Sequence, residues 1–296
     1  MRIHSIDLNF QGLPGLISAY LIEFGNELVL VETGPGSTLP MLLKGVETLG
    51  FTPAEIRHVF VTHVHLDHAG AAGWFAQQGA TIYAHARAVP HLIDPEKLIA
   101  SASLVYGEKM EKLWGKMLPA PKDRVRILKD GERVKIGKTT FTAVDTPGHA
   151  RHHHVYLCED VCFTGDVAGM KLPDCNYLSV TAAPPQFDPV AYSESLAKLH
   201  ELGLSKLYLT HGGEISNVSR HLSDYALRVE QAYESVADLY EMGLKGVILQ
   251  EAYSQIEYQI ALSAGVTEAD WERYEITNPS AMCADGIALF CEKNPR

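Results

Sequence analysis

Three histidines and one aspartate lie within six residues of one another, in the segment 62–68 (THVHLDH). Imidazoles packed this closely repel one another when protonated and compete for water when buried. A divalent metal ion removes both problems, because His63, His65, Asp67 and His68 offer nitrogen and oxygen donors that zinc, iron and manganese accept. The alternative is a histidine-rich loop without a metal, and the more distant residues described next argue against it.

Three further candidate ligands, His149, Asp166 and His211, each follow an apolar, strand-like segment. Ligands at the ends of several strands can converge at one edge of a sheet although they are far apart in sequence. Sets of three protein ligands leave positions open for water, as a catalytic ion requires. The pattern therefore predicts two adjacent divalent ions, with zinc favoured and iron or manganese as alternatives. The predicted sets are His63, His65 and His149 for one ion and Asp67, His68 and His211 for the other, with Asp166 as the bridge.

The elements that position these residues are strands followed by loops. The apolar run 57–61 predicts a strand buried on both faces, which delivers the histidine-rich segment. Residues 1–215 alternate strand and helix patterns with several hairpins, which favours sheets layered with helices in an α/β (α+β) fold. The segment 95–117 predicts a helical insertion. Only helical patterns follow residue 216, in the ranges 217–242, 254–264, 267–274 and 278–292. We therefore expect a catalytic domain at 1–215 and a helical region at 216–296 that packs on it.

The order of the candidate ligands resembles a known family. The pattern His-x-His-x-Asp-His at 63–68, followed by Gly-His at 148–149, Gly-Asp at 165–166 and His211, resembles the metallo-β-lactamase superfamily over roughly residues 15–215. The resemblance implies a four-layer αββα sandwich and the same ligand roles. Asp166 and the segment 148–153 (GHARHH) are similar to the glyoxalase II branch of hydrolases, whose Gly-His-x-x-Gly-His motif has glycine where this chain has His152.

Two further residues are expected to contact the ligand side chains without binding a metal ion themselves. Glu32 stands where the family usually has an aspartate in an Asp-Thr-Gly motif, and its carboxylate is expected to accept a hydrogen bond from a ligand histidine. The alternative for Glu32 is a salt bridge at the surface. His153 matches the second histidine of the glyoxalase II motif, and we expect it in the outer shell of the site. The residues that bind substrate are not recognisable in the sequence.

Composition limits the partners. The chain has 296 residues with a formal net charge of −11, which disfavours nucleic acid as a partner because affinity for phosphates rests on lysine and arginine. No apolar run approaches the length of a membrane span, and the first residues lack the pattern of a signal peptide, so we expect a cytoplasmic protein without a membrane partner.

The five cysteines show no Cys-x-x-Cys pair and are interpreted as buried free thiols. The C-terminal helices are expected to pack on the sandwich, with a lid over the site or a homodimer interface as alternatives.

The predicted chemistry is metal-assisted hydrolysis of a small-molecule substrate. Two divalent ions that share a water lower its pKa, so that hydroxide is available near neutral pH. Asp67 is expected to orient this nucleophile and to accept its proton. An ester, lactone or thioester is the favoured substrate, with a phosphodiester next. The alternatives are a persulfide dioxygenase with one iron at His63, His149 and Asp166, and a metal-binding module without catalysis.

Overall fold

The computed structural model describes residues 1–296, and the chain divides into two compact units. Unit 1 consists of residues 1–145 and 152–165, and unit 2 consists of residues 146–151 and 166–296. Residue 215 lies inside unit 2, and the two domains expected from the sequence stay a prediction. No helix is long and apolar enough to cross a membrane.

Unit 1 contains a mixed sheet of six strands in the order β1-β2-β3-β4-β5-β6. The first three strands are antiparallel neighbours, whereas β3 to β6 run parallel. Parallel strands end at the same edge of a sheet, so β4 and β5 deliver the loops that follow them to one edge. The strands are β1 (Arg2–Asp7), β2 (Ser18–Phe24), β3 (Glu27–Val31), β4 (His58–Phe60), β5 (Thr81–His85) and β6 (Val125–Leu128).

Four further strands of unit 1 are antiparallel neighbours in chain order: β7 (Arg133–Ile136), β8 (Thr139–Asp145), β9 (His154–Cys158) and β10 (Val161–Gly165). Aromatic side chains join them to the first sheet. The rings of Phe60 and Phe141 stack with centroids 4.8 Å apart, and the hydroxyl of Tyr156 donates to the carbonyl oxygen of Val61 at 2.9 Å. Two sheets therefore pack face to face around a buried core, as the sequence predicted.

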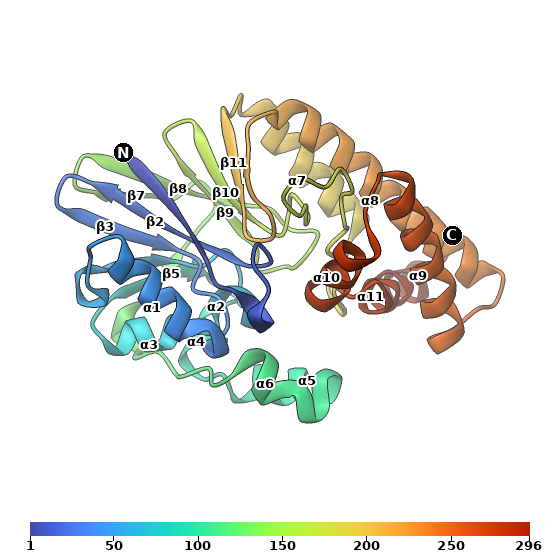
Figure 1. The fold of residues 1–296 in the computed structure, drawn as a ribbon, viewed down its shortest axis with the longest axis horizontal. Coiled ribbons are helices and arrows are strands. Elements are labelled where there is room, and N and C mark those ends of the chain that lie inside the picture. Colours follow the sequence, from blue (N-terminus) through green and yellow to red (C-terminus); the bar gives the residue numbers. More distant parts are fainter. The chain divides into compact units, whose positions relative to one another are not determined.

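The helices of unit 1 are α1 (Leu39–Thr48), α2 (Leu66–Ala69), α3 (Ala72–Gln77), α4 (Val89–Ile93), α5 (Glu96–Tyr106) and α6 (Met110–Trp114). Figure 1 shows α1, α3 and α4 on the outer face of the first sheet. The predicted helical insertion at 95–117 is present as two helices. Gly107 follows α5 with φ of 52°, a left-handed conformation that ends the α-helix and leaves α6 to begin separately.

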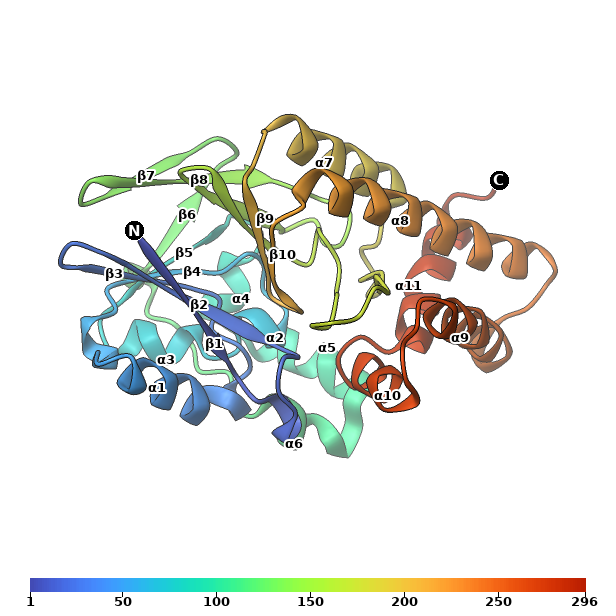
Figure 2. The ribbon, with the colours of Figure 1, turned by 45° about the horizontal axis from the view of Figure 1, so that its top comes forward.

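Unit 2 is mainly helical, as Figure 2 shows for its C-terminal part. Its elements are α7 (Pro189–Glu201), β11 (Lys206–Leu209), β12 (Gly213–Ile215), α8 (Val218–Glu241), α9 (Gly246–Ser263), α10 (Glu268–Thr277) and α11 (Ser280–Lys293). The prediction of helices after residue 216 is confirmed. The start predicted at 254 is wrong, because α9 begins at Gly246, a residue that interrupts the helical pattern in the sequence.

All five cysteines are free and buried, which confirms the interpretation of their spacing. Burial raises the pKa of the Cys158 thiol to about 12 and that of Cys162 further. These thiols are therefore protonated near neutral pH and act as small apolar side chains.

Candidate metal centre

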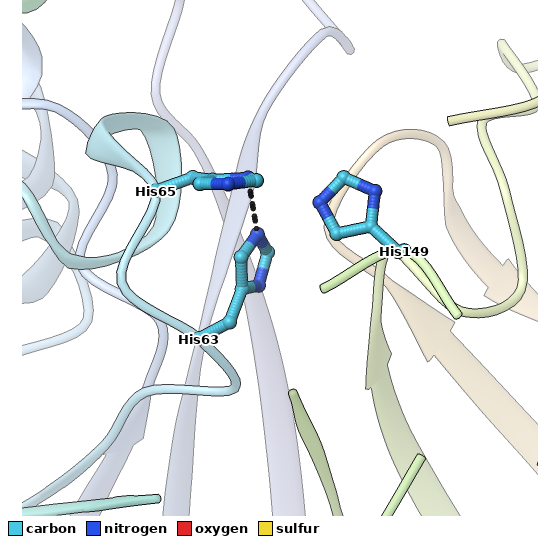
Figure 3. A group of neighbouring side chains, drawn as sticks. All are labelled: His63, His65 and His149. Atoms are coloured by element: carbon cyan, nitrogen blue, oxygen red, sulfur yellow. Dashed lines mark hydrogen bonds between the residues drawn. The ribbon is translucent and has the colours of Figure 1, made fainter. Parts of the chain in front are cut away.

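The histidine-rich segment forms the part of the site that unit 1 contributes. Strand β4 ends at Phe60, the chain turns, and His63 is fully buried while His65 is half-buried. Their ring atoms Nε2 and Nδ1 are 3.0 Å apart, and Figure 3 shows this contact as a dashed line. Two nitrogens bound to the same zinc ion lie about 3.3 Å apart when each bond is 2.0–2.1 Å and the geometry is tetrahedral. The separation of these two nitrogens therefore suits a shared ion.

Asp67 and His68 form a second pair of donors in unit 1. Both lie in the one-turn helix α2, and Asp67 Oδ2 is 3.6 Å from Nε2 of the fully buried His68. This separation is also close to that of two ligands of one ion. The Asp67 side chain keeps 17% of its surface exposed, so water can reach this carboxylate.

Glu32 supports both pairs from inside the protein. It is fully buried, which excludes the surface salt bridge considered as its alternative. The Thr62 hydroxyl donates to Glu32 Oε1 at 2.5 Å, and Thr62 Oγ1 lies 3.0 Å from His63 Nδ1. Because the Thr62 proton points to Glu32, the Thr62 oxygen accepts from Nδ1–H, and Nε2 of His63 keeps its lone pair for a metal. Glu32 Oε1 also lies 3.4 Å from His68 Nδ1.

The three consecutive histidines after Arg151 have different surroundings. His153 is buried with its ring centroid 5.0 Å from that of His63, whereas the His152 ring lies 6.0 Å from His63 and 5.5 Å from His65. The sequence pointed only to His153, because it matches the second histidine of the glyoxalase II motif and because alternation along a strand would turn its neighbours away. Strand β9 begins at His154, so His152 and His153 precede it and need not alternate. The position of His152 was therefore missed.

Unit 2 brings together His149, Asp166 and His211, which are all buried. Oδ2 of Asp166 lies 3.3 Å from Nε2 of His149, and Oδ1 of Asp166 lies 3.4 Å from Nε2 of His211. Each oxygen of one carboxylate thus faces the imidazole of a different histidine, at the separation expected for two ligands of one ion. A carboxylate held in this way can bind one ion through each oxygen.

The tautomer of His149 is set by the main chain. Its Nδ1 lies 3.0 Å from the carbonyl oxygen of Thr181, which can only accept a hydrogen bond. Nδ1 of His149 therefore carries a proton in this contact, and Nε2, the atom that faces Asp166, has the lone pair that a metal ion binds. Thr181 belongs to the loop 173–188, which precedes α7.

A separate polar cluster lies in unit 1 at His85, Asp145 and His154, the ends of β5, β8 and β9. His154 Nε2 is 2.5 Å from Asp145 Oδ1, and His85 Nε2 is 3.8 Å from the same oxygen. The backbone N–H of Arg87 donates to His85 Nδ1, so the neutral His85 ring has its proton on Nε2. That tautomer offers no lone pair towards Asp145, and hydrogen bonding explains the cluster better than a metal. Burial, followed by the neighbouring His154, lowers the pKa of His85.

The candidate ligands thus form one group in each unit. Unit 1 holds His63, His65, Asp67 and His68, and unit 2 holds His149, Asp166 and His211. Their imidazole nitrogens and carboxylate oxygens are the donors that zinc, iron and manganese share, and the buried members have little access to water as a competing ligand. The residues therefore fit divalent metal ions.

Comparison with known proteins gives a consistent result. The model of the metallo-beta-lactamase superfamily matches residues 12–211. A metallo-beta-lactamase fold-containing protein of Sulfurisphaera tokodaii is 27% identical over 218 residues, which is 72% of this chain and 79% of that protein. A lactamase-like protein of Penicillium aethiopicum is 26% identical over 249 residues, covering 80% of this chain and 67% of its own length.

Among solved structures, a metallo-beta-lactamase family protein from Thermus thermophilus superposes with a TM-score of 0.68. The match covers 98% of this chain and 93% of that structure at 20% identity, so it supports the fold alone. The predicted αββα sandwich with additional C-terminal helices is confirmed. The glyoxalase II branch, which the sequence favoured, is not distinguished by these matches.

Proposed function

Because the chain belongs to the metallo-beta-lactamase superfamily, we propose that it is a metal-dependent hydrolase with two divalent ions, and that zinc is the metal. The ligands of the first ion are His63, His65 and His149, and those of the second are Asp67, His68 and His211. Asp166 is the bridge. This assignment joins ligands of both units on the strength of the ligand order that the family shares.

The observation that carries the two-ion proposal is the carboxylate of Asp166. Its two oxygens face Nε2 of His149 and Nε2 of His211, at 3.3 and 3.4 Å. With an imidazole beside each of its oxygens, the Asp166 carboxylate would hold two ions rather than one.

When bound, the two ions supply a nucleophile at the level of hydroxide near neutral pH and polarise the scissile group. Residues of the chain would position the water, accept its proton and fix the tautomers of the ligand histidines. Asp67, which is partly exposed, holds the attacking water and accepts its proton. Thr62 and Glu32 fix the tautomer of His63, and the carbonyl of Thr181 fixes that of His149.

The proposed substrate is a small molecule with an ester, lactone or thioester bond. The net charge of −11 opposes a large polyanionic substrate. Phosphodiester hydrolysis, persulfide oxidation and binding without catalysis are the competing functions, and each predicts a different result in the same experiment.

Metal analysis of the purified protein, combined with an activity panel, tests the proposal. We expect two zinc ions per chain and turnover of an ester, lactone or thioester. One iron per chain with oxygen consumption on a persulfide would replace the proposal by the dioxygenase, and phosphodiester turnover alone would change the substrate class. Two ions without turnover of any panel substrate would favour the binding module.

Asp67→Asn tests the role of the partly exposed carboxylate. Because asparagine has a similar size but cannot accept the proton, kcat should fall by about 10²–10⁴-fold. The control is Asp123→Asn, because the Asp123 side chain is 80% exposed and takes part in neither ligand group. Wild-type kcat in an Asp67→Asn protein with an unchanged metal content would exclude Asp67 as the base.

A further inference from the structure

Two tyrosines of unit 2, Tyr192 on α7 and Tyr225 on α8, are completely buried. A buried hydroxyl needs hydrogen-bond partners, and the partners of a core tyrosine are usually nearby main-chain groups of no functional interest. Here the partners belong to Asp166, a candidate metal ligand, and to Thr181, whose carbonyl contacts His149. The two hydroxyl oxygens lie 3.0 Å apart, and they meet the side chain and main chain of Thr181 in the loop 173–188.

The hydroxyls of Tyr192, Tyr225 and Thr181 form a cluster, and two of them contact the main chain of Asp166. The carbonyl oxygen of Asp166 accepts from the Tyr192 hydroxyl at 2.8 Å and lies 2.9 Å from Thr181 Oγ1. The carboxylate of the same residue faces His149 and His211. Two hydroxyls thus hold the backbone of the residue that we assign as the bridging ligand.

The same cluster is connected to the imidazole of His149 through the main chain of Thr181. The carbonyl of Thr181 accepts from His149 Nδ1, and the backbone N–H of the same Thr181 donates to the Tyr225 hydroxyl at 3.3 Å. The side chain of Thr181 lies 2.8 Å from the Tyr192 hydroxyl. The carbonyl that orients His149 is therefore attached to a residue whose N–H and hydroxyl both contact the tyrosines.

Close packing fixes the two tyrosine rings against the same segments. Gly148, the residue before His149, leaves room for Tyr192, since a Cβ there would lie 2.4 Å from Tyr192 Cα. Gly169, three residues after Asp166, leaves room for Tyr225, since a Cβ there would lie 2.1 Å from its ring. Burial raises the pKa of Tyr225 to about 12 and raises that of Tyr192 well above its ordinary value, so both hydroxyls keep their protons.

We propose that the hydroxyls of Thr181, Tyr192 and Tyr225 are positioning groups for the metal ligands His149 and Asp166, so that α7 and α8 set the metal affinity of the centre. This inference rests on the proposed function, because it needs His149 and Asp166 to bind metal. Removal of hydrogen-bond partners behind metal ligands commonly lowers affinity by about 10–100-fold. The hydroxyl cluster should have an effect of that size.

The test measures zinc affinity by competition with a chelator, in the full-length protein, for wild type, Tyr192→Phe, Tyr225→Phe and Thr181→Val. Each change removes a hydroxyl with little change in shape, and we expect zinc affinity to fall by about tenfold or more. Thr181→Ser, which restores a hydroxyl, should recover most of the loss seen with Thr181→Val. The d–d absorption bands of the cobalt-substituted variants should shift, because the ligand geometry changes.

Tyr274→Phe is the matched control for lost stability. The Tyr274 hydroxyl accepts from the N–H of Leu172 and donates to the carbonyl of Tyr177, so this variant also loses two buried hydrogen bonds but none to Asp166 or Thr181. We expect a lower melting temperature with wild-type zinc affinity and wild-type cobalt bands. The inference is overturned if the cluster variants bind zinc as tightly as wild type, or if Tyr274→Phe loses as much affinity as they do. A wild-type protein that binds no divalent ion would instead contradict the proposed function itself.

Discussion

At the scale of single residues, Glu32 connects the two donor pairs of unit 1. One carboxylate oxygen accepts from Thr62, which in turn accepts from His63, and the same oxygen lies near His68. Glu32 also has φ of 65°, a conformation that is uncommon for residues other than glycine. Its backbone is therefore held by its surroundings in a geometry that aims the side chain at the histidines.

Glu32→Gln should weaken metal binding without removing any ligand. The amide has one acceptor oxygen instead of two and no negative charge, so it supports the His63 and His68 tautomers less well. We expect the zinc dissociation constant, measured with a competing chelator, to rise by about 10–100-fold. Glu32→Asp keeps the charge and should show a smaller rise. Equal affinities for wild type and Glu32→Gln would mean that Glu32 acts only in folding.

A single buried histidine, His221, also makes the stability of the fold depend on pH. His221 on α8 is buried, and its Nε2 lies 2.9 Å from the carbonyl oxygen of Ala168. Burial lowers the pKa of His221 from its ordinary value of 6.5, so the folded protein binds this proton less readily than the unfolded chain. The stabilisation is present above pH 6.5 and is lost as the pH falls through that value towards the lower folded pKa.

Urea unfolding of the metal-free protein between pH 7.5 and 5.5 checks this expectation. The free energy of unfolding should decrease towards pH 5.5, and His221→Gln should show a shallower decrease because glutamine does not titrate. Chelator must be present throughout, because bound metal competes with protonation of the candidate ligand histidines and would make the stability depend on pH in its own way. An identical slope in the variant would assign the pH dependence to other groups, such as His85.

At the scale of elements, helix α11 contacts the loop that carries Thr181. A Cβ on Gly286 would lie 1.8 Å from the carbonyl oxygen of Ala182. Alanine normally stabilises a helix interior by up to about 1 kcal/mol relative to glycine. The backbone contact reverses the sign, because overpacking against a rigid neighbour costs about 1–3 kcal/mol.

Gly286→Ala should therefore lower the melting temperature. Gly45→Ala in α1 is the comparison, because its new Cβ would lie 2.4 Å from a side-chain atom of Ile6, and a side chain gives way at lower cost than a backbone carbonyl. We expect a clearly smaller loss of thermal stability for Gly45→Ala. Equal losses in both variants would show that the loop at Ala182 yields as easily as an isoleucine side chain.

The elements also show which features the sequence can specify. The strand before His63 and the loops before His149, Asp166 and His211 were predictable, because apolar runs and glycines mark strand ends locally. The start of α9 and the short strand β12 were missed. Gly246 looks like a helix breaker in sequence, and three residues carry too little pattern to identify a strand. The contact of His149 with Thr181 joins residues 32 positions apart, so no local pattern predicts it.

At the scale of the whole molecule, metal ions should add to the stability of the fold. An ion that binds only the folded chain stabilises it by about 2.7 kcal/mol when its free concentration is 100 times the dissociation constant. We expect the melting temperature to fall on treatment with a chelator and to recover when zinc is returned. Magnesium, which prefers oxygen ligands, should restore less than zinc does. A melting temperature that is indifferent to both chelator and zinc would contradict a metal centre.

The division of the chain into units also has a consequence for synthesis on the ribosome. Unit 2 begins with the short segment 146–151, and the chain then returns to unit 1 before residue 166. His149 is therefore synthesised well before the residues that hold it in place. Thr181, whose carbonyl contacts its ring, follows 32 residues later, and Tyr225, which contacts Thr181, is 44 residues beyond Thr181. A nascent chain that has passed residue 165 has every strand of unit 1, yet it still lacks Thr181, whose carbonyl oxygen lies 3.0 Å from His149 Nδ1. The hydrogen bond that orients the His149 ring can therefore form only after Thr181 has left the ribosome.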